Sequence, residues 1–172
     1  MPTKQEAVAA PSFQGYIAKA DDTDVVKAIR RSTKEFRKLL KSLPAKKRQY
    51  AYAEGKWTIQ EMLQHIIDAE RVFTYRALTF ARRDGTQLPG FDENSWAANV
   101  NKTKRKWKEL VNEFTTMRAG TELFFASLTD EDLLFNGTAN NHPANALAMG
   151  YVTAGHVKHH IGIIKERYLG KK

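Results

Sequence analysis

Two histidines in the last third of the chain have a spacing that could bind one metal ion. His156 and His160 lie four residues apart in the segment GYVTAGHVKHHIGIIKERY. On a helix, both fall within the apolar arc, and their Cβ atoms lie about 5–6 Å apart on adjacent turns. Two imidazoles at this spacing can converge on one ion, as such pairs do in helical zinc sites.

Burial of these two imidazoles requires compensation, because an unpartnered buried polar group costs about 1–3 kcal/mol. One metal ion would compensate both rings. Separate hydrogen bonds to a carboxylate, a carbonyl or water would do so without a metal, and the spacing leaves both interpretations open. The chain has no cysteine, so thiolate ligands and disulfides are excluded.

A third ligand would have to come from the remaining histidines. His159 projects into the polar arc of the last helix, where we expect it to be solvated. His142 lies in the loop before that helix. If the helix were continuous, His142 would be more than three turns from His156. His65 lies at the border of an earlier apolar stripe and could face a neighbouring helix. Taken alone, however, His65 is better explained by ordinary packing at the edge of the core.

Glu70 is another ionisable residue on an apolar face, between Ile66 and Phe73. It lies about 140° around the helix from His65, so the two cannot easily bind one ion side by side. Glu70 could instead orient a group near the cavity, but we expect it to pair with a buried Arg or Lys, the usual compensation for a buried carboxylate.

Four amphipathic segments must position these residues. Apolar residues recur at helical spacing in each, and a capping box from Thr58 to Glu61 marks the start of the second. The expected helices cover residues 22–43, 58–83, 107–128 and about 143–168. Such helices bury their stripes most simply as an all-α four-helix bundle. The long connection 84–100 permits a crossover.

The remaining segments are expected to be irregular. Residues 1–20 contain two prolines and are expected to form an extended or loosely packed N-terminal lead-in segment, followed by one bundle domain at 21–170. The connection TDEDLLFNGTANNHP is rich in Asn, Asp, Gly and Pro, which predicts a loop. No segment shows the strict alternation of a strand.

Composition excludes several classes of protein. The 172 residues fit one globular domain, and no apolar run predicts a membrane span or a secretory signal, so we expect a cytoplasmic protein. The net charge of +9 could attract an anionic partner. The basic residues are dispersed, however, and the cluster from Lys102 to Lys108 has the pattern of a solvated helix face. We therefore expect no nucleic-acid partner.

Three stretches in order carry a family resemblance. GKWTIQEMLQHIIDAERVFTYRAL, LPGFDENSW and AGHVKHHIGIIKERYL resemble the DinB/YfiT-like superfamily, and the resemblance spans about residues 22–169. It implies a four-helix bundle with an up-down-down-up course. It also implies a divalent metal held by three histidines, which match His65, His156 and His160.

The resemblance further implies an activity type. Family members include thiol S-transferases and isomerases that use low-molecular-weight thiols, and others are described as hydrolases. We therefore expect a divalent-metal-dependent enzyme that acts on a small-molecule substrate, for example a low-molecular-weight thiol. The metals of the family include nickel, zinc, iron and manganese. Three histidines favour such borderline first-row ions over magnesium or calcium but do not choose among them. We expect zinc or nickel, with iron or manganese as alternatives. Members commonly form homodimers, which makes a homodimer the expected assembly.

Two other functions remain open. The chain could be a non-enzymatic, stress-associated bundle that binds metal for stability or sensing, or a basic module for nucleic acid, an idea that rests on net charge alone. The mouth of the site could be lined by Trp57 and by Asn140, Asn141 and His142, although capping and turn formation explain these four residues better. No general base can be assigned.

Overall fold

Four long helices form the body of the protein. The computed structural model describes residues 2–100 and 105–170. The long helices are α2 (Val25–Ser42), α3 (Ile59–Ala81), α5 (Trp107–Ala126) and α7 (Ala146–Ile163), the last continuing as a π-helical turn over Ile164–Tyr168. The expected all-α four-helix bundle is confirmed.

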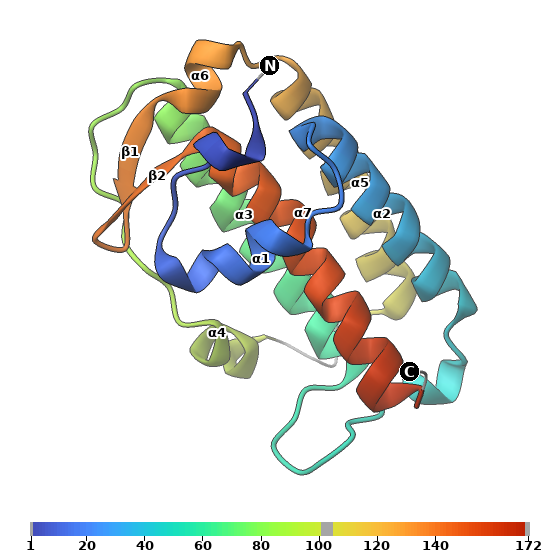
Figure 1. Ribbon diagram of the computed structural model, residues 1–172. Helices are drawn as coiled ribbons and strands as arrows, with labels where there is room; N and C mark the ends of the chain where they lie inside the picture. The colour runs from blue at the N-terminus through green and yellow to red at the C-terminus, as the bar shows by residue number, and fades with distance from the viewer. Residues whose placement is uncertain (1, 101–104, 171–172) are drawn as a thin grey trace.

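The helices form a four-membered ring. α7 packs against α2 and α3, and α5 packs against the other sides of the same two helices (Figure 1). α2 and α7 run in one direction while α3 and α5 run in the other, which gives the up-down-down-up course. Because α3 and α5 are parallel, the chain must cross the bundle between them, and the short helix α4 (Glu93–Asn99) lies in that crossing.

Side-chain caps explain where the helices begin. The Asp24 carboxylate accepts from the backbone N–H of Lys27 at 2.8 Å at the start of α2. The capping box expected before α3 is present, because Thr58 N–H donates to Glu61 Oε2 at 2.7 Å and Glu61 N–H donates to Thr58 Oγ1 at 3.1 Å. These bonds satisfy amide groups that a helix leaves unpaired at its first turn.

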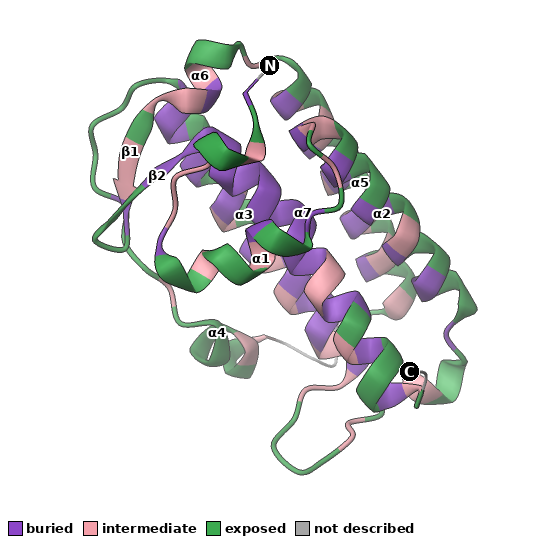
Figure 2. Ribbon diagram, in the orientation of Figure 1, coloured by how far each residue is buried: buried purple, intermediate pink, exposed green. Residues whose placement is uncertain are grey.

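Burial of α7 differs from the sequence-based expectation. It is buried on nearly all sides over its first twelve residues, so the expected polar arc is half-buried or exposed only from Lys158 onward (Figure 2). The reason is the short helix α1 (Gln14–Lys19), which packs on its outer face. The approach requires Gly155, since a Cβ there would lie 1.7 Å from the carbonyl oxygen of Tyr16. α7 is thus the central helix of the fold.

The N-terminal residues are packed, and the expectation of a loose lead-in was wrong. Besides α1 they form two short 3₁₀ turns, Lys4–Glu6 and Pro11–Phe13. The side chain of Asn145 donates to the carbonyl of Glu6 at 2.9 Å, and its backbone N–H donates to the carbonyl of Val8 at 3.0 Å. Asn145 therefore has two roles: it caps α7, and it attaches the N-terminal segment to the start of that helix.

The segment expected to be a loop contains regular structure. It forms α6 (Asp130–Leu134) and an antiparallel hairpin of β1 (Asn136–Ala139) and β2 (His142–Asn145), so the expectation of no strand was wrong. The two turn residues, Asn140 and Asn141, have positive φ angles of 50° and 61°, which suit a tight hairpin turn. Strands of four residues are too short for a period of two to be visible in sequence.

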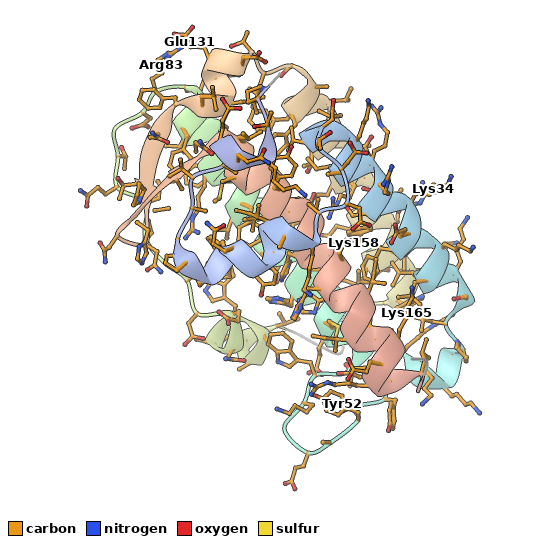
Figure 3. All side chains as sticks on the ribbon, in the orientation of Figure 1. Lys34, Tyr52, Arg83, Glu131, Lys158 and Lys165 are labelled. Carbon is orange, nitrogen blue, oxygen red and sulfur yellow. The ribbon has the colours of Figure 1, made fainter. Side chains whose placement is uncertain are left out.

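The hairpin also holds the chain crossing. Leu88 N–H donates to the carbonyl of Thr138 at 3.0 Å, and Asn140 N–H donates to the carbonyl of Leu88 at 2.9 Å. At the same end of the bundle, Arg83 and Glu131 form an ion pair at 3.1 Å between the end of α3 and α6 (Figure 3). The crossing therefore has a fixed position next to the hairpin.

None of the helices in the described part of the chain is long and apolar enough to cross a membrane. Lys158 of α7, labelled in Figure 3, pairs with Glu35 of α2 at 2.7 Å and with Asp21. In the basic cluster singled out in the sequence, Lys102 and Lys104 lie outside the described residues.

Candidate metal centre

Three histidine side chains from two helices meet in the bundle. His65 comes from α3, and His156 and His160 come from consecutive turns of α7. The Nε2 atom of His156 lies 3.0 Å from that of His65 and 3.0 Å from that of His160. All three ligand atoms lie within 4.8 Å of one another. We call these three residues the histidine cluster.

Hydrogen bonding among the rings does not satisfy the histidine cluster. A nitrogen of a neutral imidazole either donates or accepts. His156 Nε2 has two equally close neighbours and can make a good hydrogen bond with only one of them. An ion that accepted all three lone pairs would remove this conflict. Nitrogens bound to tetrahedral zinc at ordinary bond lengths lie about 3.3 Å apart, close to the spacing found here.

Electrostatics keeps these imidazoles neutral. Burial lowers the pKa of His156 and of His160 well below the ordinary value for histidine. The pKa of His65 falls to about 4, chiefly because of burial, and the carboxylate of Glu93 opposes this decrease. Neutral imidazole is the form that binds metal ions. The histidine cluster is therefore in its ligating form at neutral pH.

Aromatic rings surround the histidine cluster. The Trp57 ring lies 4.7 Å from that of His65, between centroids. The rings of Tyr16 and Phe73 meet the His156 ring edge-on at centroid distances of 5.3 and 5.7 Å. These contacts restrict the rotation of the imidazoles and exclude water from most sides.

One side of the histidine cluster opens into a cavity of about 360 Å³. Its polar lining includes Glu93 at the start of α4, the phenol of Tyr16, Arg76 of α3 and Asn140 of the hairpin turn. Burial raises the pKa of Tyr16, and the nearby Glu93 raises it further. A ligand in this cavity would thus meet the three imidazoles at one end and several hydrogen-bonding groups along the walls.

Glu70 lies apart from this site in a second buried polar group. Its carboxylate forms an ion pair with Nε of Arg118 from α5 at 2.7 Å and accepts from Thr121 Oγ1 at 2.7 Å. Arg118 also donates to the carbonyl of Thr153 at 3.1 Å and to Ser32 Oγ at 3.3 Å. The prediction that Glu70 pairs with a buried cation is confirmed. We call Glu70, Arg118 and Thr121 the ion-pair cluster.

Other residues singled out in the sequence have mixed outcomes. Trp57 and Asn140 line the cavity, whereas Asn141 and His142 are exposed at the hairpin turn and do not. His159 is half-buried, not fully solvated, because the ring of Tyr16 covers it at a centroid distance of 5.4 Å.

The cavity residues that the sequence-based reasoning missed include Tyr16, Glu93 and Arg76. Tyr16 belongs to a helix of six residues, too short to show a period. Glu93 follows Asp92, whose carboxylate caps α4 by accepting from Asn94 N–H at 2.9 Å, and the Asp-Glu pair was a usable signal of a helix start. Arg76 gave a signal as well, since it is a charged residue on the apolar stripe of α3.

A four-helix bundle with a buried histidine cluster of this kind defines a class of candidate metalloproteins, and comparison with known proteins identifies the family. The model of the DinB superfamily matches residues 28–164, so the chain belongs to the DinB superfamily. Among solved structures it is similar to YfiT from Bacillus subtilis, a probable metal-dependent hydrolase with an unusual four-helix bundle topology. That match has a TM-score of 0.67 at 15% identity and covers 96% of this chain and 91% of YfiT. No curated protein matches significantly.

Proposed function

We propose that this protein is a divalent-metal-dependent enzyme that acts on a small molecule, with the ion held by His65, His156 and His160. The observation that carries the proposal is the convergence of three neutral imidazole nitrogens at the end of a cavity. A structural site usually has four protein ligands, whereas a catalytic site keeps a position open. Three ligands beside a cavity favour the catalytic arrangement.

Hydrolysis is the reaction class that the site supports best. A divalent ion bound there would supply Lewis acidity, which polarises a carbonyl or phosphoryl group and lowers the pKa of water. The similarity to YfiT, itself a probable metal-dependent hydrolase, supports the same class. Thiol transfer is the second reaction class, because a thiolate could bind at the open position. Zinc or nickel is the expected ion, with iron or manganese as alternatives.

Two side chains of the cavity are suited to proton transfer. The carboxylate of Glu93 faces the cavity close enough to perturb both His65 and Tyr16, so it can accept a proton from water or from a thiol. The phenol of Tyr16 is protonated at neutral pH, as an ordinary tyrosine is, and burial raises its pKa further, so it can donate a hydrogen bond to an oxygen of the substrate. Glu93 is therefore the proposed base.

The alternative is a metal-binding bundle without catalysis. In that case the ion would stabilise the folded chain by mass action, since it binds only the folded state. The cavity beside the histidine cluster and the carboxylate of Glu93 would then have no role. A chain that binds metal but shows no metal-dependent turnover would favour this alternative.

Metal binding is tested first, by elemental analysis of protein purified without a histidine tag. About one ion per chain is expected, and His156→Ala and His160→Ala should each abolish stoichiometric binding. His159→Ala is the matched control, because His159 is on the same helix but outside the histidine cluster. Full metal content in both cluster variants would refute the site.

Catalysis is tested next, with ester, amide and thiol-conjugation substrates and with metal-loaded and metal-stripped protein. We expect turnover by the loaded form only. Glu93→Gln should decrease kcat by about 100-fold or more without changing metal content, as expected for loss of a general base. Turnover that is indifferent to the metal would exclude a metal-dependent enzyme.

A further inference from the structure

Arg76 is a buried cation without a carboxylate partner in the described part of the chain. Only 2% of it is exposed. Its Nη2 donates to the carbonyl of Pro89 at 2.7 Å, and its guanidinium lies 5.9 Å from the centroid of the Phe91 ring. Burial lowers the pKa of Arg76, which reflects the cost of removing this charge from water. A buried charge normally has an ionic partner, because the desolvation of an ion costs several kcal/mol.

The position of Arg76 within the cavity is informative. His65, Ala69, Phe73 and Arg76 follow one another on α3 at spacings of four, four and three, so they share one face. All four line the cavity that reaches the histidine cluster. Arg76 follows His65 by eleven positions on the helix, which corresponds to about 16 Å between their Cα atoms. Arg76 thus stands at the far end of the cavity from the histidine cluster.

The wall around Arg76 is fixed in place. Pro89, which accepts its hydrogen bond, adjoins Leu88, which is hydrogen-bonded to the hairpin. The next residue, Gly90, packs so closely on the hairpin turn that a Cβ there would lie 2.5 Å from Asn140 Oδ1. The guanidinium is therefore held by a rigid loop, and one carbonyl uses only one of its five N–H donors.

We propose that Arg76 binds a carboxylate of the substrate, so that the substrate spans the cavity from this anionic end to a reacting end at the histidine cluster. A carboxylate matches the fork of donors on a guanidinium. One cation balances one negative charge, which favours a carboxylate over a doubly charged phosphate. The reacting end rests on the proposed function, whereas the anion site does not need a metal.

A purely structural role for Arg76 predicts a different outcome. If Arg76 only ties Pro89 to α3, its replacement should lower stability without any selectivity between charged and neutral ligands. Arg76→Gln separates the two roles, because glutamine can still donate to the Pro89 carbonyl but has no charge. Arg37→Gln is the matched control: it removes one positive charge from the exposed face of α2, which contributes no residue to the cavity.

The experiment measures the binding of 4-phenylbutyrate and of its neutral amide to metal-free protein by titration calorimetry. The unaltered protein and Arg37→Gln should bind the carboxylate at least about tenfold more tightly than the amide. Arg76→Gln should abolish this preference, and Arg76→Lys should retain part of it. Metal content after reloading should be the same in all four proteins, so the result does not depend on whether the enzyme proposal holds.

Three results would overturn the proposal. One is equal affinity of the unaltered protein for the two compounds, and another is no binding of the carboxylate at millimolar concentration. The third is a preference that survives unchanged in Arg76→Gln. Inorganic phosphate serves as a further probe: if it binds through Arg76 and the carboxylate does not, the class of anion proposed here is wrong.

Discussion

Two clusters of buried polar side chains lie in the same bundle, and their buried polarity is compensated in different ways. The ion-pair cluster joins Glu70 to Arg118, whose side chains are 2% and 0% exposed. The histidine cluster also joins α3 to another long helix, but its three neutral rings offer one another no charge and too few donors. The ion-pair cluster has its counter-charge within the chain, whereas the histidine cluster does not.

The surroundings of the two clusters differ in the same sense. The ion-pair cluster is enclosed by the core. Within it Thr121 donates to Glu70, and the carbonyl of Thr153 accepts a further hydrogen bond from Arg118. The histidine cluster borders a cavity. A buried polar group with internal compensation thus belongs to the architecture, while one that lacks compensation and opens to a cavity is a candidate for ligand binding.

The largest effect is expected from breaking the ion-pair cluster. Arg118→Met leaves the Glu70 carboxylate buried without its cation, so the free energy of unfolding should fall by about 3–5 kcal/mol. Chemical denaturation measures this loss, and metal content should stay the same. Adding Glu70→Leu should restore much of the stability, because two apolar residues can replace a buried pair. No recovery in the double variant would show that the pair has another role.

A substitution in the histidine cluster should have the opposite result, namely a loss of metal binding with nearly unchanged stability of the fold. His156→Ala should weaken metal binding by at least about 100-fold. Removal of a residue that only hydrogen-bonds to a ligand usually weakens binding less than this, and His156 is itself a proposed ligand. Competition with a coloured chelator measures the affinity. The metal-free variant should unfold at nearly the same denaturant concentration as the unaltered metal-free protein. A large loss of stability without metal would make the histidines structural residues, contrary to the comparison.

The stability of metal-free protein should also depend on pH through the histidine cluster. Unfolded histidine takes up a proton near pH 6.5, but folded His65 does so only near pH 4. Protonation therefore stabilises the unfolded chain as the pH falls through this window. In metal-free protein, the free energy of unfolding should decrease by about 1.4 kcal/mol per pH unit for this residue. The slope should be smaller in His65→Gln; an equal slope would assign the pH dependence to other groups.

The smallest effect is expected at the edge of the ion-pair cluster. Thr121→Val removes the hydroxyl that donates to Glu70 but keeps the shape and leaves Arg118 in place. The free energy of unfolding should fall by about 1 kcal/mol, the usual worth of one hydrogen bond. Thermal unfolding measures it, with the exposed Thr86→Val as control. A loss as large as that of Arg118→Met would mean that the ion pair depends on this hydroxyl.

Much of the bundle could be predicted because long helices repeat their signals. The stripe that includes Ile29, Phe36 and Leu40 is buried as expected, and the capping box at Thr58 is formed. The partner class of Glu70 was also predictable, since a carboxylate on an apolar face needs a cation. Which cation it takes was not, because Arg118 lies 48 residues away on a helix whose rotation only the packed bundle sets.

The walls of the candidate site were harder to predict. The position of His65 beside His156 was implied by the family resemblance and not by its phase on α3. Tyr16 and the hairpin belong to segments of six and four residues, whose structure depends on what they pack against. Local propensity is weak over such short lengths, so tertiary contacts decide.

The contact between Gly155 and the backbone of Tyr16 has a consequence for protein engineering. Because no side chain separates the two backbones, the N-terminal helix is part of the wall of the site. A shortened chain that starts after residue 20 would expose His156 to water. Its imidazole would then titrate nearer to the value of free histidine, and protons would compete with metal ions at mildly acidic pH.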